Sequence, residues 1–282
     1  MKISLCALFL VAAAGVRAQR TVHVMTALCD NKYQGIVKVP SAIGNGQKPA
    51  ANLYWGCAYG IKTFFGKSSE WKRVASVAGF PDRDSVVLER IVFRHRSGQW
   101  HLVADAYNGK HIKQCTTDFL KACAGTSSIS IEAGGVKLPS AEVAVYVGHN
   151  GLMDFSLSTG VASGNPADSG SSGASGGSGG SKRRAIVLAC ASRQYFTPYI
   201  KASGAGPLLW TTNLMCPEAY TLHDALSAYI AGGDDRAVHS AAAAAYAKYQ
   251  KCSVAAARKL IVTGYSDNRF MESVALIKNL FR

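Results

Sequence analysis

Two residues with reactive side chains, His149 and Cys190, each stand at the end of a short apolar segment. His149 follows residues 141–147 and Gly148, and Cys190 follows residues 184–189. Both segments are rich in alanine and β-branched residues and have the length of a strand, which predicts two buried β-strands. Catalytic groups gather at the carboxyl ends of parallel strands, so these two side chains would emerge side by side if the strands are neighbours. The sequence thus contains a candidate thiol–imidazole pair.

The chemistry open to such a pair is nucleophilic attack on a carbonyl. An ordinary thiol, with a pKa of about 8.5, is only partly ionised at neutral pH, and an adjacent imidazole can activate it. Cys190 would attack the scissile carbonyl, and His149 would protonate the leaving amine and then activate water. The backbone N–H groups of Gly151 (or Asn150) and Cys190 would stabilise the oxyanion, a contribution of about 2.7–4 kcal/mol per donor.

The rest of the chain alternates between strand-like and helix-like segments. Strands are predicted at residues 21–28, 85–93, 100–104, 141–147, 184–190 and 207–212. Helices are predicted at residues 50–65, 116–124, 195–202 and 221–231, and from residue 234 onward. Candidate helix caps are Thr116 or Thr117, Thr221, Asp234, Ser253 and Asp267. This alternation predicts an α/β fold, a three-layer α/β/α sandwich with a mainly parallel sheet and right-handed crossovers.

Residues 1–18 have the features of a secretory signal peptide. Lys2 precedes an apolar run, and Val16 and Ala18 are small residues at positions −3 and −1 of a cut after Ala18. The run is shorter than the roughly 20 apolar residues of a membrane span. We therefore expect an exported protein, secreted or periplasmic, with no transmembrane anchor. Residues 19–282 are expected to form a single domain.

The charge balance is strongly basic, with a formal net charge of +14. Loss of Lys2 and Arg17 with the signal peptide would leave +12. The basic residues are scattered, which favours solubility and a loose attraction to anionic surfaces or substrates. No motif for specific nucleic-acid binding is present.

Cysteine usage fits an oxidising compartment. If Cys6 leaves with the signal peptide and Cys190 is a free nucleophile, six cysteines remain, which could form three disulfides: Cys29, Cys57, Cys115, Cys123, Cys216 and Cys252. Cys115 and Cys123 lie about 12 Å apart along one predicted helix and should not pair with each other. The spacing of cysteine and histidine matches no zinc site. No metal or organic cofactor is implied.

Residues 156–181 form a Gly/Ser-rich insert between the two reactive strands. It contains 17 glycine or serine residues in 26 positions, a composition that predicts a disordered linker with no part in the core. Each half of the chain alone lacks a complete sheet, so the insert does not divide domains. The basic cluster Lys182, Arg183 and Arg184 follows it directly and is a candidate site of proteolytic processing.

In its order and context, the reactive pair resembles the caspase–hemoglobinase fold of cysteine peptidases. That family carries His-Gly at the end of one strand and Ala-Cys at the end of the next, and the histidine comes first. Here the matching residues are Gly148-His149-Asn150-Gly151 and Ala189-Cys190. The resemblance is strongest to the legumain family, and covers roughly residues 21–229. It includes the turn at 107–112 and the helix at 118–120. It implies that Asn31 orients His149, a role for which Asp154 is the alternative.

Three departures from the family pattern bear on activity. Asn150 separates His149 from Gly151, where the family has His-Gly directly. Leu188 stands two residues before the cysteine, where legumain has an acidic pocket residue. Lys32-Tyr33 replaces the Arg-His pair that follows the family's asparagine. Legumain's preference for asparagine therefore does not carry over.

The resemblance implies a cysteine endopeptidase that acts on protein or peptide substrates through an acyl-enzyme intermediate. Two other functions fit the same residues. The chain could be a non-catalytic envelope protein that keeps the fold as a binding scaffold, because fold does not dictate function. It could also be a transpeptidase, in which an amine rather than water resolves the acyl-enzyme.

Overall fold

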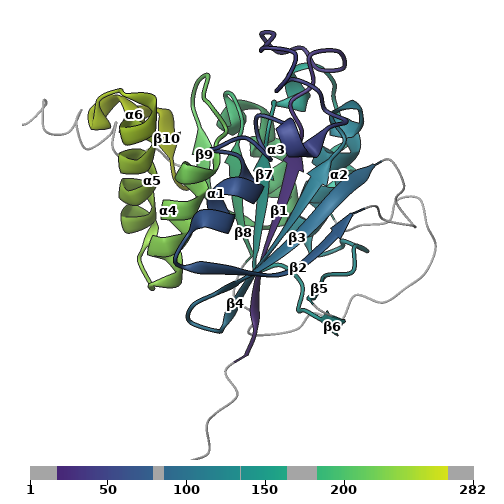
Figure 1. The fold of residues 1–282 in the computed structure, drawn as a ribbon. Helices are drawn as coiled ribbons and strands as arrows, with labels where there is room; N and C mark the ends of the chain where they lie inside the picture. Colours follow the sequence, from purple (N-terminus) through teal and green to yellow (C-terminus); the bar gives the residue numbers. More distant parts are fainter. Residues whose placement is uncertain (1–17, 79–85, 134, 164–182, 266–282) are drawn as a thin grey trace, which may run out of the picture.

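The structure, a computed structural model, describes residues 18–78, 86–133, 135–163 and 183–265. Within these residues an eight-stranded mixed sheet runs through the centre of the molecule (Figure 1). Its order is β10-β9-β8-β7-β1-β4-β3-β2. The strands are β1 (Arg20–Ala27), β2 (Trp71–Ala78), β3 (Val87–His95), β4 (Trp100–Tyr107), β7 (Val143–Val147), β8 (Arg184–Leu188), β9 (Gly206–Thr211) and β10 (Ile261–Val262).

Parallel pairing links the five strands at the middle of the sheet. β4, β1, β7, β8 and β9 run side by side in one direction. β3 and β10 run antiparallel to their neighbours, and β2 closes one edge against β3 with a bulge between Arg73 and Ala75. A separate two-stranded ribbon consists of β5 (Glu132–Ala133) and β6 (Val136–Lys137). The expected α/β class with a mainly parallel sheet is confirmed.

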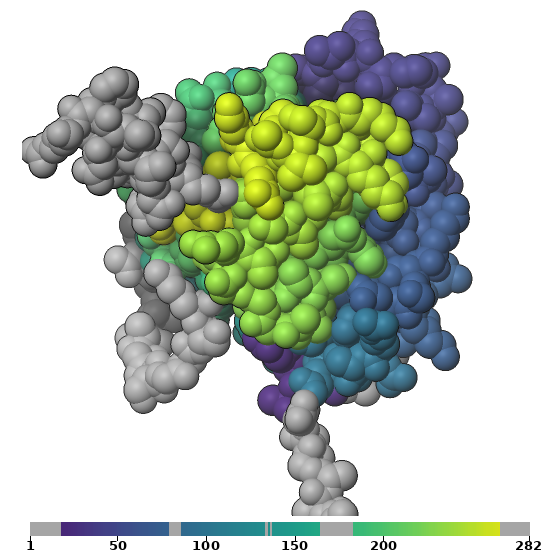
Figure 2. All heavy atoms as spheres, turned by 90° about the vertical axis from the view of Figure 1, so that its left-hand side faces the viewer, coloured from purple at the N-terminus to yellow at the C-terminus, as the bar shows by residue number. Residues whose placement is uncertain are grey.

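Helices cover both faces of this sheet. On one face, α1 (Ile61–Lys67), α4 (Ala219–Ile230) and α5 (Asp235–Gln250) pack into a cluster of buried residues that includes Val22, Val24 and Ile186. On the other face, α2 (Ile112–Ala124) and α3 (Ser192–Ser203) pack against Met25, Tyr146 and neighbouring residues. The C-terminal helices, with α6 (Val254–Leu260), cover the side of the molecule shown in Figure 2. The arrangement is compatible with the expected three-layer sandwich.

The helix predicted at residues 50–65 is wrong over most of its length. A short 3₁₀ turn, η1 (Pro49–Ala51), is followed by turns, and α1 begins only at Ile61. The cause is the side chain of Asn52, which donates to the carbonyl of Cys29 (2.8 Å) and accepts from its N–H (3.1 Å). Such side-chain bonds compete with a helix for the backbone. They attach this loop to the end of β1.

Other element boundaries also differ from the prediction. α2 begins at Ile112, so Thr116 lies inside it and donates to the carbonyl of Ile112 rather than capping the helix. Thr221 likewise lies inside α4. The predicted caps Asp234 and Ser253 are confirmed, each accepting a backbone N–H of the first turn. β2 and β10 were not predicted, and Asp267 is outside the described residues.

The insert is ordered where it begins. Residues 159–161 form a 3₁₀ turn, η5 (Thr159–Val161), and Ala162 is fully buried. Tyr199 of α3 donates its hydroxyl to the carbonyl of Leu157 (2.9 Å). The expectation that the insert takes no part in the core is therefore wrong for residues 156–163, because apolar side chains interrupt its Gly/Ser composition there. Residues 164–182 and the predicted signal peptide up to residue 17 lie outside the described part of the chain.

No helix within the described ranges is long and apolar enough to cross a membrane.

A buried carboxylate connects three central strands. Asp105 of β4 is fully buried and accepts from Arg90 of β3 (2.6 and 2.7 Å) and from Nε2 of His23 in β1 (2.8 Å). Burial alone raises the pKa of Asp105, but the hydrogen bonds and charge of Arg90, together with His23, hold that pKa well below its usual range. The ionised carboxylate therefore joins the parallel and antiparallel parts of the sheet.

Asp105→Asn is expected to lower the free energy of unfolding by about 3–5 kcal/mol, because it removes the buried carboxylate charge that pairs with the guanidinium of Arg90. Because the folded-state pKa is depressed, the stabilisation is present above the unfolded-state value of about 3.9 and is lost as the pH falls below it. Wild type should thus lose more stability than the variant in urea unfolding below about pH 4. The control is Asp235→Asn, which breaks a more exposed ion pair with Arg184 and should cost less than about 1 kcal/mol. Equal losses in the two variants would contradict the role of Asp105.

Candidate active site

His149 and Cys190 leave the sheet at the same edge, from two adjacent parallel strands. The last pair in the register of β7 and β8 is Val147 with Leu188, and the N–H of Gly148 donates to the carbonyl of Leu188 (3.2 Å). His149 lies two residues after Val147, and Cys190 lies two residues after Leu188. The predicted meeting of the two strand ends is therefore present in the structure. His149 is buried and Cys190 is half-buried.

A glycine before His149 is required by the backbone. Gly148 has φ of +145°, a conformation that other residues rarely adopt. A Cβ atom at Gly148 would lie 2.6 Å from the carbonyl oxygen of Ala27, the last residue of β1. The chain therefore turns toward His149 in close contact with the neighbouring strand end.

The ring of His149 is oriented by Asp154. Nε2 lies 2.7 Å from Oδ2 of Asp154, and the hydroxyl of Tyr146 donates to the carbonyl of His149 (2.7 Å). Asp154 is brought back toward the ring by the 3₁₀ turn η4 (Gly151–Met153), and its Oδ2 also accepts the N–H of Gly35 (3.1 Å). With the Nε2 proton donated to this carboxylate, Nδ1 is the ring nitrogen left to exchange a proton.

The assignment of Asn31 as the residue that orients His149 needs correction. Both polar atoms of its amide bond to the backbone of Val39, with Nδ2 donating to the carbonyl (2.7 Å) and Oδ1 accepting the N–H (3.0 Å). These bonds close a loop after β1, and Asp154 takes the position beside the histidine. Asp154 is hard to identify from the sequence, because nothing in its neighbouring residues predicts the turn that folds it back toward His149.

Asn150, the residue that departs from the family pattern, links the two reactive loops. It is fully buried, and its Nδ2 donates to the backbone carbonyl of Cys190 (2.7 Å). Its Oδ1 accepts the N–H of Leu152 (3.1 Å), which caps η4. One side chain therefore fixes the position of the cysteine and starts the turn that carries Asp154.

Cys190 sits in a sharp turn between β8 and α3. Ala191, directly after it, has φ of +46° and ψ of +34°, the left-handed region. The turn is held by the N–H of Ala191, which donates to the carbonyl of Asn213 (2.9 Å), and by Thr211, which donates to the carbonyl of Ala189. The sulfur lies 3.4 Å from the nitrogen and 3.5 Å from the oxygen of Met215. The thiol is thus positioned by backbone on both sides.

The two backbone groups predicted as oxyanion donors differ in their surroundings. In the described chain, the N–H of Gly151 faces the hydroxyl of Tyr146, whereas the N–H of Cys190 donates to no backbone carbonyl. Leu188 is fully buried in the core, so it does not replace the acidic pocket residue of legumain. Lys32 and Tyr33 are exposed on the loop after β1.

The other cysteines do not form the expected disulfides. All seven cysteines in the described ranges are free in the structure. Cys29, Cys115 and Cys123 are buried, and burial raises the pKa of Cys29 to about 11 and that of Cys123 well above its usual value. Burial also raises the pKa of Cys57 and of Cys216.

The candidate processing site is only partly as predicted. Arg183 and Arg184 are half-buried. Arg184 begins β8, and its guanidinium pairs with Asp235 (2.7 Å). These two residues are held by the sheet and its neighbours, which argues against an exposed and disordered site at this point. Lys182 lies outside the described residues.

No protein-family model, no curated protein and no solved structure matches this chain.

Replacing Gly148 with alanine is expected to destabilise the protein by at least about 2 kcal/mol, because a strained φ adds to the clash with Ala27. The control is Gly98→Ala, where φ is +74° but the Cβ would meet no atom within 4 Å. There the left-handed conformation alone should cost about 1 kcal/mol. Urea unfolding of both variants measures the difference. A loss at Gly148 no larger than that at Gly98 would contradict the close packing of the two strand ends.

Asn150→Asp keeps the oxygen that accepts from Leu152 but removes the donor to the Cys190 carbonyl. We expect a loss of about 1–3 kcal/mol in the free energy of unfolding, and slower alkylation of Cys190 by iodoacetamide. Asn31→Asp is the matched variant, because it removes a similar Nδ2 bond at Val39 and should leave the alkylation rate unchanged. Slower alkylation in Asn31→Asp alone would restore Asn31 to the site.

Proposed function

We propose that this chain is an exported cysteine endopeptidase of caspase-like fold that cleaves peptide bonds through a His149–Cys190 dyad. The observation that carries this proposal is the placement of both residues at the carboxyl ends of adjacent parallel strands, with His149 bonded to Asp154 and the Cys190 loop bonded to Asn150. Parallel sheets hold ligands and catalytic groups at this edge. An activated nucleophile needs a base that is itself oriented by a third group, and Asp154 supplies that group.

In the proposed reaction, the Cys190 sulfur attacks the carbonyl carbon of the scissile peptide bond. Its proton passes to Nδ1 of His149, which then gives a proton to the leaving amine. The N–H groups of Cys190 and Gly151 stabilise the oxyanion of each tetrahedral intermediate. Water, activated by His149, hydrolyses the acyl-enzyme and restores the thiol. Asp154 keeps the ring in the tautomer that this cycle needs.

One observation favours the binding scaffold as the alternative function. The Cys190 sulfur contacts the Met215 backbone through both its N–H and its carbonyl. A thiol held in this way could be a packing residue rather than a nucleophile. Thiol reactivity separates the two functions, because a scaffold has no need of an activated cysteine.

Wild-type protein is expected to react rapidly with an iodoacetamide probe at Cys190, and His149→Ala should slow this labelling at least about 100-fold, the lower end of the roughly 10²–10⁴ range of general-base effects. Asp154→Asn should slow it less, because it disturbs the ring without removing it. Mass-spectrometric mapping gives the rate at each cysteine. Exposed Cys252 is the internal reference, and its rate should be the same in all variants. Slow labelling of Cys190 in wild type, or its recovery in a disulfide, would overturn the peptidase function and favour the scaffold.

Product analysis separates hydrolysis from transpeptidation. Wild-type protein is incubated with a peptide library in the presence and absence of an added peptide amine. Free carboxyl products under both conditions indicate an endopeptidase, whereas capture of the added amine in a new peptide bond indicates a transpeptidase. Cys190→Ala should abolish both kinds of product.

A further inference from the structure

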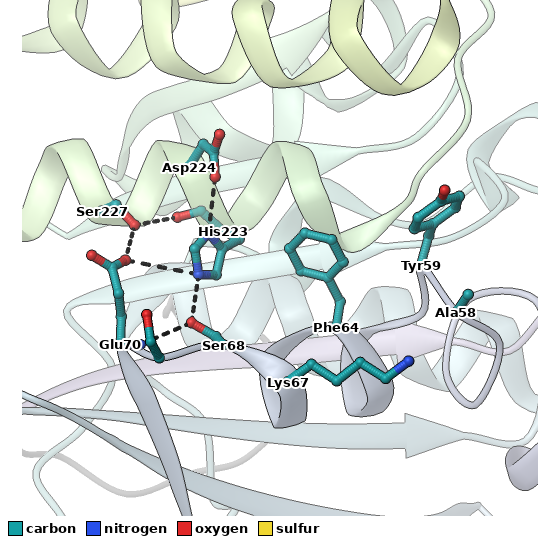
Figure 3. A pocket seen from close by; sticks show the side chains of 10 residues that line it. Ala58, Tyr59, Phe64, Lys67, Ser68, Glu70, His223, Asp224 and Ser227 are labelled. Atoms are coloured by element: carbon teal, nitrogen blue, oxygen red, sulfur yellow. Dashed lines mark hydrogen bonds and ion pairs between the residues drawn. The ribbon is translucent and has the colours of Figure 1, made fainter.

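A cavity of about 620 Å³ lies beside α1 and α4, and Cys190 is not among the residues that line it. It is formed by the turn between α1 and β2 together with the outer face of α4 (Figure 3). The N–H of Arg96 donates to the carbonyl of Glu70 (2.8 Å), which places this turn beside the β3–β4 hairpin. β4 starts at that hairpin, so the cavity lies toward the amino ends of the parallel strands. The candidate active site lies at their carboxyl ends.

Three polar side chains in this cavity form a continuous chain of hydrogen bonds. The Oγ of Ser68 lies 2.8 Å from Nε2 of His223, and Nδ1 of His223 lies 2.8 Å from Oδ1 of Asp224. Figure 3 shows the imidazole between the hydroxyl and the carboxylate. Hydroxyl, imidazole and carboxylate in this order are the groups that activate a serine nucleophile, and the arrangement is recognised by geometry rather than by position in the sequence.

The neighbouring bonds favour the proton positions that such a site needs. The N–H of Glu70 donates to Ser68 Oγ (3.1 Å), which leaves the serine proton for His223 Nε2. Glu70 also has a carboxylate oxygen 3.7 Å from Nε2. That carboxylate, however, already pairs with Arg96 (3.0 Å) and accepts from Ser227. Asp224 can therefore take the Nδ1 proton while Nε2 remains the base facing Ser68.

The imidazole is also held in place by packing. The rings of Phe64 and Phe65 each lie 5.5 Å from the ring of His223, centroid to centroid. The side chain of His223 is only 15 % exposed, whereas Asp224 is 47 % exposed and reaches solvent. Phe64, with Tyr59 and Ala58, forms an apolar wall of the cavity. This wall suits an apolar or aromatic acyl group.

We propose that Ser68, His223 and Asp224 form a second catalytic site, an esterase site that accepts carboxylic esters with an apolar or aromatic acyl group. Ser68 Oγ attacks the ester carbonyl carbon while His223 Nε2 takes the hydroxyl proton. The C–O bond to the leaving alcohol then breaks, and the alcohol departs with that proton. Water, deprotonated by His223, hydrolyses the acyl-serine and releases the carboxylic acid. The N–H of Ser69 donates no hydrogen bond in the described chain and is the donor we assign to the oxyanion.

The test uses the full chain carrying Cys190→Ala, so that its outcome is independent of the proposed peptidase. A fluorophosphonate probe is expected to label Ser68, and the protein should hydrolyse 4-nitrophenyl butyrate. Ser68→Ala should abolish both activities, His223→Ala should lower both by at least about 100-fold, and Asp224→Asn by at least about tenfold. The labelled peptide is identified by mass spectrometry.

Ser203→Ala is the matched control, because it removes a hydroxyl of α3 that bonds to Ile200 and does not line this cavity, and it should change labelling by less than about twofold. Circular dichroism establishes that each variant is folded. If His223→Ala does not fold, Ser68→Ala and Asp224→Asn still decide the question. A folded protein that the probe does not label at Ser68, or labels equally in Asp224→Asn, would overturn the proposal. The three side chains would then serve only to join the α1–β2 turn to α4.

Discussion

The carboxylate of Asp105 is the constraint on which the sheet depends. It lies in β4, between β1 on the parallel side and β3 on the antiparallel side, and receives a hydrogen bond from each. A buried charge is costly unless it is fully paired, so Arg90, His23 and Asp105 must be placed together or not at all. Arg90 also donates to the carbonyl of Ser130 (2.7 Å), which extends the network to the segment before β5. The register of three strands is thereby fixed.

The fixed position of β1 governs the geometry of the reactive loops. The end of β1 contacts Gly148, and Gly148 aims the chain into His149. The side chain of Asn150 then links this segment to the Cys190 loop through one hydrogen bond. Two strands in register bring the two loops to the same edge, but the hydrogen bonds of single side chains fix how the loops face each other. The inserted Asn150 is therefore part of the architecture of the site.

The sequence predicts well those features that depend on local apolar patterns. The strands that lead to His149 and Cys190 are continuous buried runs, and both were found from composition and length alone. Features that depend on distant partners were not found. Asn52 prevents a helix because it bonds to Cys29, which lies 23 residues earlier in the chain. Asp154 reaches His149 through the turn η4. The residue that caps this turn, Asn150, bonds to the Cys190 loop, which follows a different strand. The sequence of edge strand β2 shows no regular alternation of apolar and polar residues, because only its first residue is buried.

β2 also decides how the molecule behaves beside copies of itself. As the last strand of the sheet it has an edge of backbone groups that could pair with another chain, and Val74 and Val77 are exposed on it. Lys72 and Arg73 place two adjacent positive charges at the start of this edge, and the bulge after Arg73 interrupts its regular pleat. Charges and bulges are the means by which proteins prevent strand-to-strand aggregation. The opposite edge, β10, is only two residues long, so little of it is open to such pairing. The features that oppose edge-to-edge pairing thus belong to residues that take no part in either proposed reaction.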